Sequence, residues 1–518
     1  MKLLHCMILI LLLLMPMAWL QPRAPLRAAA AAGEAPEFRA LWVDGFHSGI
    51  RSAEEVARLI RNARSANVNT LIVQVRRRGD ALYAKSFEPP IEDPSYDGKF
   101  DGLAAVLEAA HAEGIEVHAW INATPIWRDE APPKDPRHVY NLHGPAQTGD
   151  TNWLTRSPKG EFKFPVGYFL DPGNPGAAAY LVEVYLNIVR NYPVDGIHFD
   201  YIRYPETEER LERGAGVGYN ETSLARFRRA TGRTDTPTPS DERFTEWRRR
   251  QVTQLVRRIY IETKALNPHL KVSAAAIAWG KPPSSERDFL DMSPGQRIFQ
   301  DWNGWLKEGI LDLAIPMNYA READPTVRGW FDGWIRWEKQ HRHGRQIAVG
   351  IGAYLNSKES NLAQLGRVRH PLGKGRVDGM SFFSYASMYA AQRQDAPSPP
   401  QAPPADRFEY LSRGANAPFA RQAPVPRMPW IDKPVTGWIA GMAIGPNGKG
   451  IDGAAVEMRR AGWSPFRRSA RTVTDGTGWF GFADVAPGRY EVQLGRAAKA
   501  MVDVAAGKVG RAELRSPH

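Results

Sequence analysis

Residues 194–205 read VDGIHFDYIRYP and place apolar and ionisable side chains on one short strand. Side chains alternate across a strand, so Ile197 and Phe199 share one face while His198 and Asp200 share the other. A carboxylate is costly to bury alone, so the face that carries Asp200 should meet a polar environment. The stretch therefore predicts a strand with one side packed on apolar residues and the other ending at a pocket.

A unit of helical pattern, small turn and short apolar strand recurs from residue 38 to about residue 385. Strands that alternate with helices indicate parallel pairing through right-handed crossovers. We therefore expect an α/β fold, a (β/α)8 barrel of the TIM type with insertions. An open doubly wound sheet is the alternative, but no glycine-rich phosphate loop follows the first strand. The predicted strands are 38–44, 70–76, 116–122, 196–204, 271–279, 311–319, 346–354 and 379–385.

The chain divides into four segments by composition. Residues 1–32 read as a signal peptide and 33–395 as the barrel domain. Residues 396–434 read as a proline-rich, semi-rigid linker, and 435–518 as a small all-β sandwich. The N-terminal apolar run is shorter than the about 20 residues of a membrane span, so an uncleaved anchor is the weaker alternative. We expect export to the periplasm or cell exterior, with no stable membrane span after signal cleavage.

Composition narrows the classes of chemistry and partner. The net charge of +12 suits contact with anionic envelope polymers, or a solvated arginine-rich surface, but the basic residues are too scattered for a nucleic-acid site. The single cysteine, Cys6, lies in the predicted signal peptide, so the remaining chain has no thiol chemistry. No set of His, Asp and Glu residues has the spacing of metal ligands, so we expect no metal and no other cofactor.

The active site of such a barrel lies at the C-terminal ends of its strands. Asp44 and Asp200 are the carboxylates expected there, and Arg76 is expected to keep one of them ionised. The insertion at 123–170 is predicted to form a wall of the site. Alternation within the strands predicts the following inward-facing side chains: Trp42, Asp44, Gln74, Arg76, His118, Trp120, Asn122, His198, Asp200, Trp279, Asn318, Tyr354 and Tyr385.

Aromatic rings around carboxylates suit a sugar, whose C–H faces stack on rings and whose hydroxyls need hydrogen-bond acceptors. Cleavage of a glycosidic bond needs two carboxyl groups, one to protonate the leaving oxygen and one to act as nucleophile or base. The pattern of side chains at the strand ends therefore predicts a glycoside hydrolase.

Four ordered motifs carry a family resemblance: FRALWVDG (38–45), VQVRRRGDALYAKSFEP (73–89), HAWIN (118–122) and FLDPGNPGAAAYLVEVYLNIVRNYPVDGIHFDYIRYP (169–205). The chain resembles the glycosyl-hydrolase-like family 10 proteins of bacteria over roughly residues 37–390. The resemblance implies a barrel that cleaves glycan strands, notably peptidoglycan stripped of its stem peptides.

By position, Asp200 matches the fourth-strand Asp of that family, Asp80 the acid of its R-x-x-G-D-A-x-Y segment, and Asp171 its L-D-P-G-N-P turn. Many relatives have two consecutive acids where this chain has Asp200 followed by Tyr201. The second acid must then come from Asp44, Asp80 or a loop.

The run TVTDGTGWFGFADVAPGRYEVQL (472–494) resembles the carboxypeptidase-regulatory-like, transthyretin-like domains. Asp475, Gly478 and Phe480 match the T-D-x-x-G-x-F turn of those domains. We expect an accessory module without catalysis, in which Asp475 is a turn residue.

The predicted function is hydrolysis of a bacterial envelope polysaccharide, with Asp200 as nucleophile or electrostatic stabiliser and Asp80 or Asp44 as general acid. Non-catalytic roles are the alternatives: a turn for Asp80, a loop contact for Asp44, a helix N-cap for Asp171 and a core position for His198. For the whole protein, the alternatives are a glycan-binding protein without hydrolysis and an adhesin or scaffold. The predicted substrate-binding residues are Trp42, Gln74, Arg76, Trp120, Asn122, His198, Tyr201, Arg203, Trp279, Asn318, Tyr319, Tyr354 and Tyr385.

Overall fold

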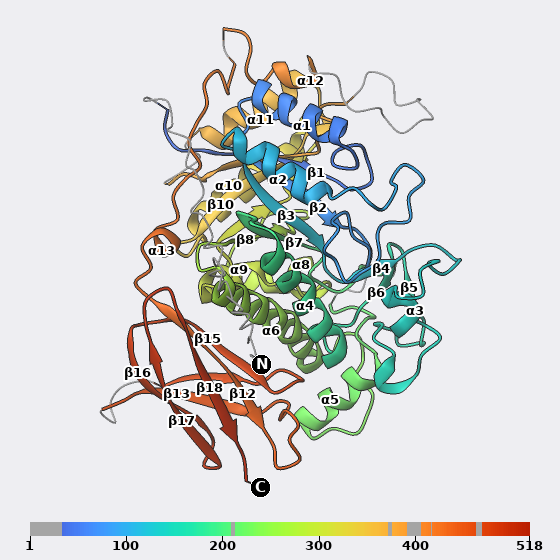
Figure 1. Ribbon diagram of the computed structural model, residues 1–518, viewed down its shortest axis with the longest axis vertical. Helices are drawn as coiled ribbons and strands as arrows, with labels where there is room; N and C mark the ends of the chain where they lie inside the picture. The colour runs from blue at the N-terminus through green and yellow to red at the C-terminus, as the bar shows by residue number, and fades with distance from the viewer. Residues whose placement is uncertain are drawn as a thin grey trace, which may run out of the picture.

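The computed structural model describes residues 34–208, 213–370, 375–390, 406–415, 417–462 and 469–517. Parallel strands close into a barrel in the order β1-β11-β10-β9-β8-β7-β3-β2 (Figure 1). The predicted barrel is therefore confirmed and the open doubly wound sheet is wrong, whereas the predicted signal peptide lies outside the described residues. The barrel strands are β1 (Phe38–Val43), β2 (Thr70–Arg76), β3 (Glu116–Asn122), β7 (Gly196–Asp200), β8 (Lys271–Ala276), β9 (Leu313–Pro316), β10 (Gln346–Gly352) and β11 (Gly379–Phe383).

Helices cover the outside of the barrel between successive strands (Figure 1). The first of them begins at Ala53, directly after Ser52, whose hydroxyl accepts a hydrogen bond from the backbone N–H of Glu55. The helices of the barrel domain are α1 (Ala53–Ser65), α2 (Gly102–Ala112), α4 (Pro175–Asn191), α5 (Glu221–Thr231), α6 (Glu242–Leu266), α7 (Glu286–Asp291), α8 (Ser293–Gln296), α9 (Trp302–Glu308), α10 (Pro325–Gln340) and α11 (Lys358–Arg369), with the short 3₁₀ helix η2 (Ala353–Leu355) before α11.

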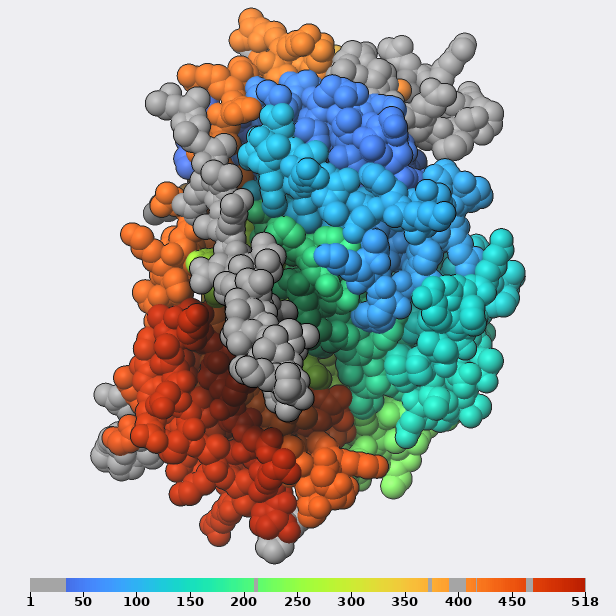
Figure 2. Space-filling model, in the orientation of Figure 1, coloured from blue at the N-terminus to red at the C-terminus, as the bar shows by residue number. Residues whose placement is uncertain are grey.

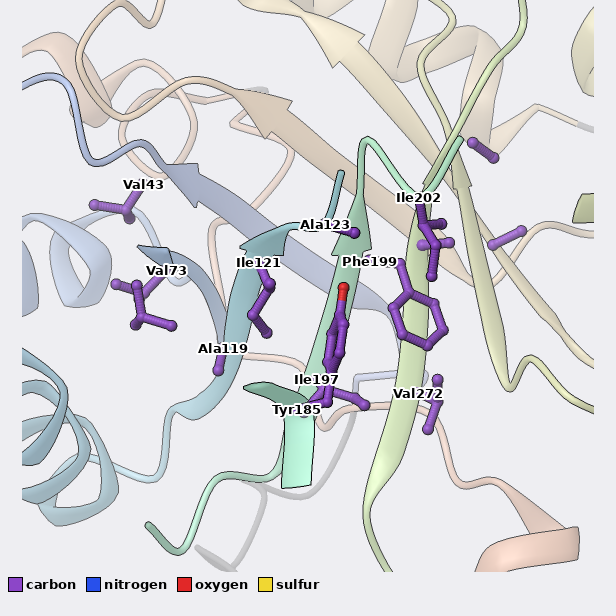
Figure 3. Close-up of a cluster of buried hydrophobic side chains, with 14 of the residues drawn as sticks. Val43, Val73, Ala119, Ile121, Ala123, Tyr185, Ile197, Phe199, Ile202 and Val272 are labelled. Atoms are coloured by element: carbon purple, nitrogen blue, oxygen red, sulfur yellow. The ribbon is translucent and has the colours of Figure 1, made fainter. Parts of the chain in front are cut away.

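The two faces of each barrel strand carry different layers of side chains. Ile197 and Phe199 lie in the apolar layer between strands and helices, where the Phe199 ring meets Tyr185 of α4 (Figure 3). Phe38 and Trp42 of β1 instead belong to a separate cluster inside the barrel. The predicted alternation of β7 is thereby confirmed, and His198 and Asp200 take the inner face.

The long insertion after β3 folds into its own small sheet, with strand order β4-β6-β5. It lies beside the barrel, close to α5 (Figure 1). Its elements are β4 (Pro125–Trp127), α3 (Val139–His143), the 3₁₀ helix η1 (Gly149–Thr151), β5 (Lys163–Phe164) and β6 (Gly167–Phe169).

The C-terminal region is a sandwich of two sheets with strand orders β15-β12-β18 and β14-β13-β16-β17, as predicted. The Asp475 carboxylate accepts hydrogen bonds from the backbone N–H groups of Thr477 and Trp479, so the predicted turn is confirmed. Membership of the carboxypeptidase-regulatory-like domains stays a prediction. The strands are β12 (Gly437–Ile444), β13 (Ala455–Arg460), β14 (Ala470–Val473), β15 (Trp479–Val485), β16 (Gly488–Leu494), β17 (Ala498–Val504) and β18 (Val509–Arg515).

The sandwich is seated on the barrel domain along α6, and the two lie directly against each other in Figure 2. Glu262 of α6 accepts hydrogen bonds from the indole of Trp479 and from the guanidinium of Arg511. Arg226 of α5 pairs with Asp452 at 2.7 Å. These contacts anchor the sandwich at both ends of the shared surface.

Part of the predicted linker packs on the barrel instead of spanning free space. Phe408 and Phe419 are buried in the outer apolar layer, next to the short helix α12 (Asp406–Glu409). Met428 and Ile431, around α13 (Pro429–Asp432), join the cluster inside the barrel at its N-terminal end. For residues 406–434 the expectation of a spacer is therefore wrong, because the apolar residues among the prolines supply a packing surface.

Candidate active site

Asp200 ends β7 next to Asn122, its register partner at the end of β3. One carboxylate oxygen accepts a hydrogen bond from the backbone N–H of Tyr201 at 2.7 Å, and the other from the indole of Trp120 at 3.1 Å. The same indole N–H also reaches the Asn122 amide oxygen at 3.0 Å. Burial raises the pKa of Asp200 to about 6, although these donors and the charge of Arg203 oppose the shift. Asp200 can therefore change its charge near neutral pH.

Arg203 supplies the positive charge that favours the ionised form of Asp200. Its guanidinium lies 4.4 Å from the ring centre of Tyr201 and 5.3 Å from that of Trp279. Arg203 is only 3% exposed, and it forms an ion pair with Glu206 at 3.3 Å. The structure thus brings together Asp200, Tyr201, Arg203 and Trp279, all of which the sequence predicts as site residues.

Arg76 does not take the predicted position. The pairing of β2 with β3 shifts between Gln74 and Arg76, which places Arg76 opposite the outward-facing Ile121. There it is fully buried and forms two hydrogen bonds with Glu88, at 2.7 and 2.8 Å. The expectation that Arg76 faces the site and holds a catalytic carboxylate ionised is wrong, because this β-bulge turns the side chain to the other face.

Below the site, His198 links β1 to β8 through the barrel interior. The Trp42 indole donates to His198 Nε2 at 3.0 Å, and His198 Nδ1 contacts the Ser273 hydroxyl at 2.9 Å. An indole N–H can only donate, so Nε2 must be the accepting nitrogen and the ring is neutral with its proton on Nδ1. Burial also lowers the pKa of His198. His198 is therefore a buried core histidine, which agrees with the non-catalytic role considered for it above. His118 is also buried.

Aromatic rings cover the inner side of the site. Phe383 at the end of β11 lies 6.2 Å from Trp42, 6.4 Å from Trp120, 5.7 Å from Tyr319 and 6.0 Å from Tyr354, measured between ring centres. Sequence reasoning missed Phe383, although alternation from Ser381 along β11 places it inside.

The two predicted tyrosines in this cluster differ in exposure. Tyr354 is 41% exposed, whereas the hydroxyl of Tyr319 is buried and has no hydrogen-bond partner among the described residues. Burial, and after it the charge of Asp200, raises the pKa of Tyr319. Tyr319 is thus a neutral donor within electrostatic reach of Asp200.

Two predicted inward residues face the helices instead. The Tyr385 hydroxyl accepts a hydrogen bond from Asn62 of α1 at 3.1 Å, and Asn318 donates to Glu338 of α10 at 2.9 Å. Both expectations are wrong for a local reason. β11 ends at Phe383, so its alternation does not extend to Tyr385. Around Asn318, the interior positions belong to its neighbours Met317 and Tyr319.

Asp44 lies at the end of β1 and is shared among three donors. It accepts hydrogen bonds from the Phe46 backbone N–H at 3.1 Å and from the Ser384 hydroxyl at 3.2 Å, and it contacts His47 Nδ1 at 2.6 Å. Burial would raise the pKa of Asp44, but His47 and the other donors lower it overall. The hydrogen bond to Asp44 in turn raises the pKa of His47. Beside them, the Gln74 amide oxygen accepts from the Gly45 N–H at 2.8 Å.

The remaining two aspartates organise loops. Asp80 accepts hydrogen bonds from the backbone N–H of Arg77 and of Arg78, at 3.3 and 3.0 Å, which agrees with a turn role. Asp171 accepts from the Gly173 N–H and the Tyr204 hydroxyl, both at 2.8 Å. The N-cap of α4 is Asn174, so the alternative that Asp171 caps this helix is wrong.

An open hollow of about 380 Å³ lies in the insertion after β3. Two of its rings, Tyr140 and Tyr168, meet edge to face at 5.0 Å. Tyr140 also lies 6.4 Å from Trp127, which contacts His138 at 5.3 Å, so a row of rings extends from the hollow toward the loop after β2. The lining residues are Tyr140, Pro145, Glu161, Phe162, Lys163 and Tyr168.

Among the described residues, no group of three or more His, Cys, Asp or Glu side chains is arranged to hold a metal ion. No helix in the same part of the chain is both long enough and apolar enough to cross a membrane.

Known proteins resemble the chain in sequence. Glycosyl hydrolase YngK of Bacillus subtilis is 23% identical over 424 residues, which cover 76% of this chain and 74% of that protein. Glycosyl hydrolase DigH of Escherichia coli (strain K12) is 24% identical over 292 residues, 51% of this chain and 59% of that protein. The solved PgaB (BpsB) glycoside hydrolase domain of Bordetella bronchiseptica aligns with a TM-score of 0.49 at 14% identity, over 68% of this chain and 94% of that one.

The family model named Glycosyl hydrolase-like 10 matches residues 37–362, which include all of β1 to β10 and the Asp200 site. This match covers well over half of the chain. The chain therefore belongs to the glycosyl hydrolase-like 10 family.

Proposed function

We propose that the protein is an exported glycoside hydrolase that cleaves a bacterial envelope polysaccharide, namely the glycan strands of peptidoglycan freed of stem peptides. The observation that carries this proposal is the state of Asp200. It is a carboxyl group at the C-terminal end of a barrel strand, enclosed by aromatic rings, with a pKa of about 6. Such a group can serve in cleavage of a glycosidic bond at neutral pH.

Asp200 acts as the nucleophile or electrostatic stabiliser at the sugar being cleaved. The Trp120 indole and the Tyr201 N–H orient its two oxygens, and the charge of Arg203 favours its ionised form. Each of these donors lies within or beside the strand ends, so the carboxylate is fixed before substrate binds.

Asp44 and His47 form the second ionisable group of the proposed site. β1 and β7 are separated by β2 and β3 around the barrel, so Asp44 faces Asp200 from another part of the wall. The lowered pKa of Asp44 makes it a poor acid, whereas its bond to His47 raises the pKa of the partly exposed imidazole. His47 is therefore the proton donor of the pair, and Asp80 shapes the loop beside it.

A polymeric substrate is supported by the insertion. The hollow lined by Tyr140, Phe162 and Tyr168 offers ring faces outside the barrel, where further sugar units of a long strand can stack. The N-terminal sequence supports export, and the resemblance of the barrel motifs to proteins that cleave peptidoglycan strands supports the substrate.

The test is digestion of purified peptidoglycan and of its peptide-free glycan strands, with mass spectrometry of the products. We expect wild type to release oligosaccharides from the peptide-free strands and Asp200→Asn to release almost none. Asp195→Asn is the matched control, because Asp195 precedes the same strand at its other end and contacts His111 there. Equal products from wild type and Asp200→Asn would reject the role of Asp200.

A non-hydrolytic glycan-binding protein is the second candidate. It is favoured by Tyr201, which stands directly after Asp200 where many relatives have a second acid. Binding of the strands by wild type without any new reducing ends would support this candidate and reject the hydrolase.

A further inference from the structure

Arg78 is a partly buried arginine whose guanidinium forms no ion pair with any described carboxylate. Its backbone N–H donates to Asp80 and its carbonyl oxygen contacts His138, so the loop after β2 holds the main chain in place. Among the described residues, no carboxylate lies within ion-pair distance of the side chain, and the guanidinium lies 4.9 Å from the ring centre of Phe46. The adjacent Arg77, by contrast, pairs with both Asp80 and Asp93.

Charges of both signs act on Arg78. Burial lowers the pKa of Arg78, the charge of Asp80 opposes this shift most strongly, and the charges of Arg128 and then Arg77 lower the pKa further. Phe46 is 41% exposed and carries the guanidinium groups of both Arg77 and Arg78 against its ring. A partly desolvated guanidinium that has other arginines near it, and no ion pair among the described residues, is stabilised when a further anion binds beside it.

This cluster adjoins the Asp200 site. Burial raises the pKa of Tyr201, while the charges of Arg203 and then Arg78 act in the opposite direction. Arg78 therefore lies within electrostatic reach of the residue that directly follows Asp200. The row of rings from His138 through Trp127 to Tyr140 also begins at the Arg78 carbonyl, so a chain of contacts connects this cluster to the hollow in the insertion.

We propose that Arg78, with Arg128 and the ring of Phe46, forms a subsite for a sugar that bears a carboxylate. The inference rests on the proposed function and names the chemistry of its substrate. A guanidinium binds a carboxylate through two parallel hydrogen bonds, and an exposed ring supports the apolar face of the sugar beside it. In a peptide-free strand of peptidoglycan, every second sugar carries a free lactyl carboxylate that fits this description.

The test compares two forms of one glycan. Peptide-free strands are used as prepared, or after carbodiimide activation and borohydride reduction have turned each carboxylate into an alcohol. We expect wild type to lose about tenfold to a hundredfold in kcat/KM on the reduced strands, the size of one charge-assisted contact. Arg78→Gln should show the same loss on native strands and little further loss on reduced ones, and Arg78→Lys should recover part of it.

Arg190→Gln is the matched control, because Arg190 is an exposed arginine of α4 that pairs with Glu183. It should leave the preference between the two glycans unchanged. An equal loss on both glycans in Arg78→Gln would overturn the subsite, because it would indicate support of the loop alone. So would a wild type that does not distinguish the two glycans.

Binding of both glycans to Asp200→Asn separates this inference from the proposed hydrolysis. If the variant binds native strands more tightly than reduced ones but wild type hydrolyses neither, the subsite is supported and the hydrolase is rejected. Hydrolysis of both glycans at equal rates would keep the hydrolase and reject the subsite.

Discussion

The indole N–H of Trp42 on β1 donates a hydrogen bond of 3.0 Å to Nε2 of His198 on β7. This bond crosses the barrel interior next to two further rings. Phe383 contacts Trp42, and Trp120 contacts His198. The floor of the candidate site is therefore continuous with the polar core of the barrel.

We expect His198→Phe to lower the free energy of unfolding by about 1–3 kcal/mol, because it leaves the buried N–H of Trp42 without an acceptor. His198→Gln should cost less, since its amide oxygen can replace Nε2. Urea denaturation of both variants measures the difference. If the two substitutions cost the same, the bond to Trp42 is not the reason that histidine is present.

Asp200→Asn should stabilise the protein at alkaline pH. The carboxyl has a folded-state pKa of about 6 against an ordinary value of 3.8, so burying its charged form costs free energy above pH 6 and costs nothing below pH 4. We expect a gain of about 1–3 kcal/mol at pH 8 that shrinks as pH falls. Chemical denaturation of both proteins at pH 8 and at pH 4.5 tests this, and a variant less stable than wild type at pH 8 would contradict it.

The activity itself should depend on pH through the same group. If Asp200 reacts as an ionised nucleophile or stabiliser, kcat/KM should fall about tenfold per pH unit below pH 6. The control is to show that the protein remains folded at the lowest pH used. A rate that instead rises as pH falls through 6 would make Asp200 the general acid.

Arg76→Met should destabilise the fold by about 3–5 kcal/mol, because it leaves the fully buried Glu88 without its partner. The double variant Arg76→Met and Glu88→Met removes both charges and should recover much of that loss. Thermal and chemical unfolding of the single and double variants forms the required cycle. Without such recovery, the ion pair would not be the source of the cost.

Removal of the sandwich after residue 434 should lower Tm by several degrees. The truncation exposes the surface of α6 on which Trp479 packs, and it leaves Glu262 without Arg511 and Arg226 without Asp452. We expect the truncated protein to remain active at low temperature, since no residue of the proposed site lies beyond 434. A truncation with unchanged Tm would mean that the sandwich is only tethered.

The sequence predicts the strands of this fold well because parallel barrel strands are short apolar runs separated by helical patterns. It also predicts which side of β7 is polar, because strict alternation holds within that strand, as Ile197 and Asp200 show. Alternation in the sequence correctly predicts those site residues that lie inside regular strands.

The errors arise where that regularity ends. A bulge turns Arg76 to the helix side, and Tyr385 lies beyond the end of β11. The positive charge that acts on Asp200 is that of Arg203, three residues along the same chain segment, and not that of Arg76. No periodic pattern encodes such local breaks, because they depend on hydrogen bonds and packing contributed by other strands.

The segment around Met428 and Ile431 fills the N-terminal end of the barrel, and β1 pairs with β11, more than 330 residues later in the chain. The barrel thus cannot be completed until nearly the whole domain, together with the segment that seals it, has left the ribosome. Contacts so distant in sequence form slowly. A chain with this architecture therefore completes its fold only after the strands from both ends of the domain have met.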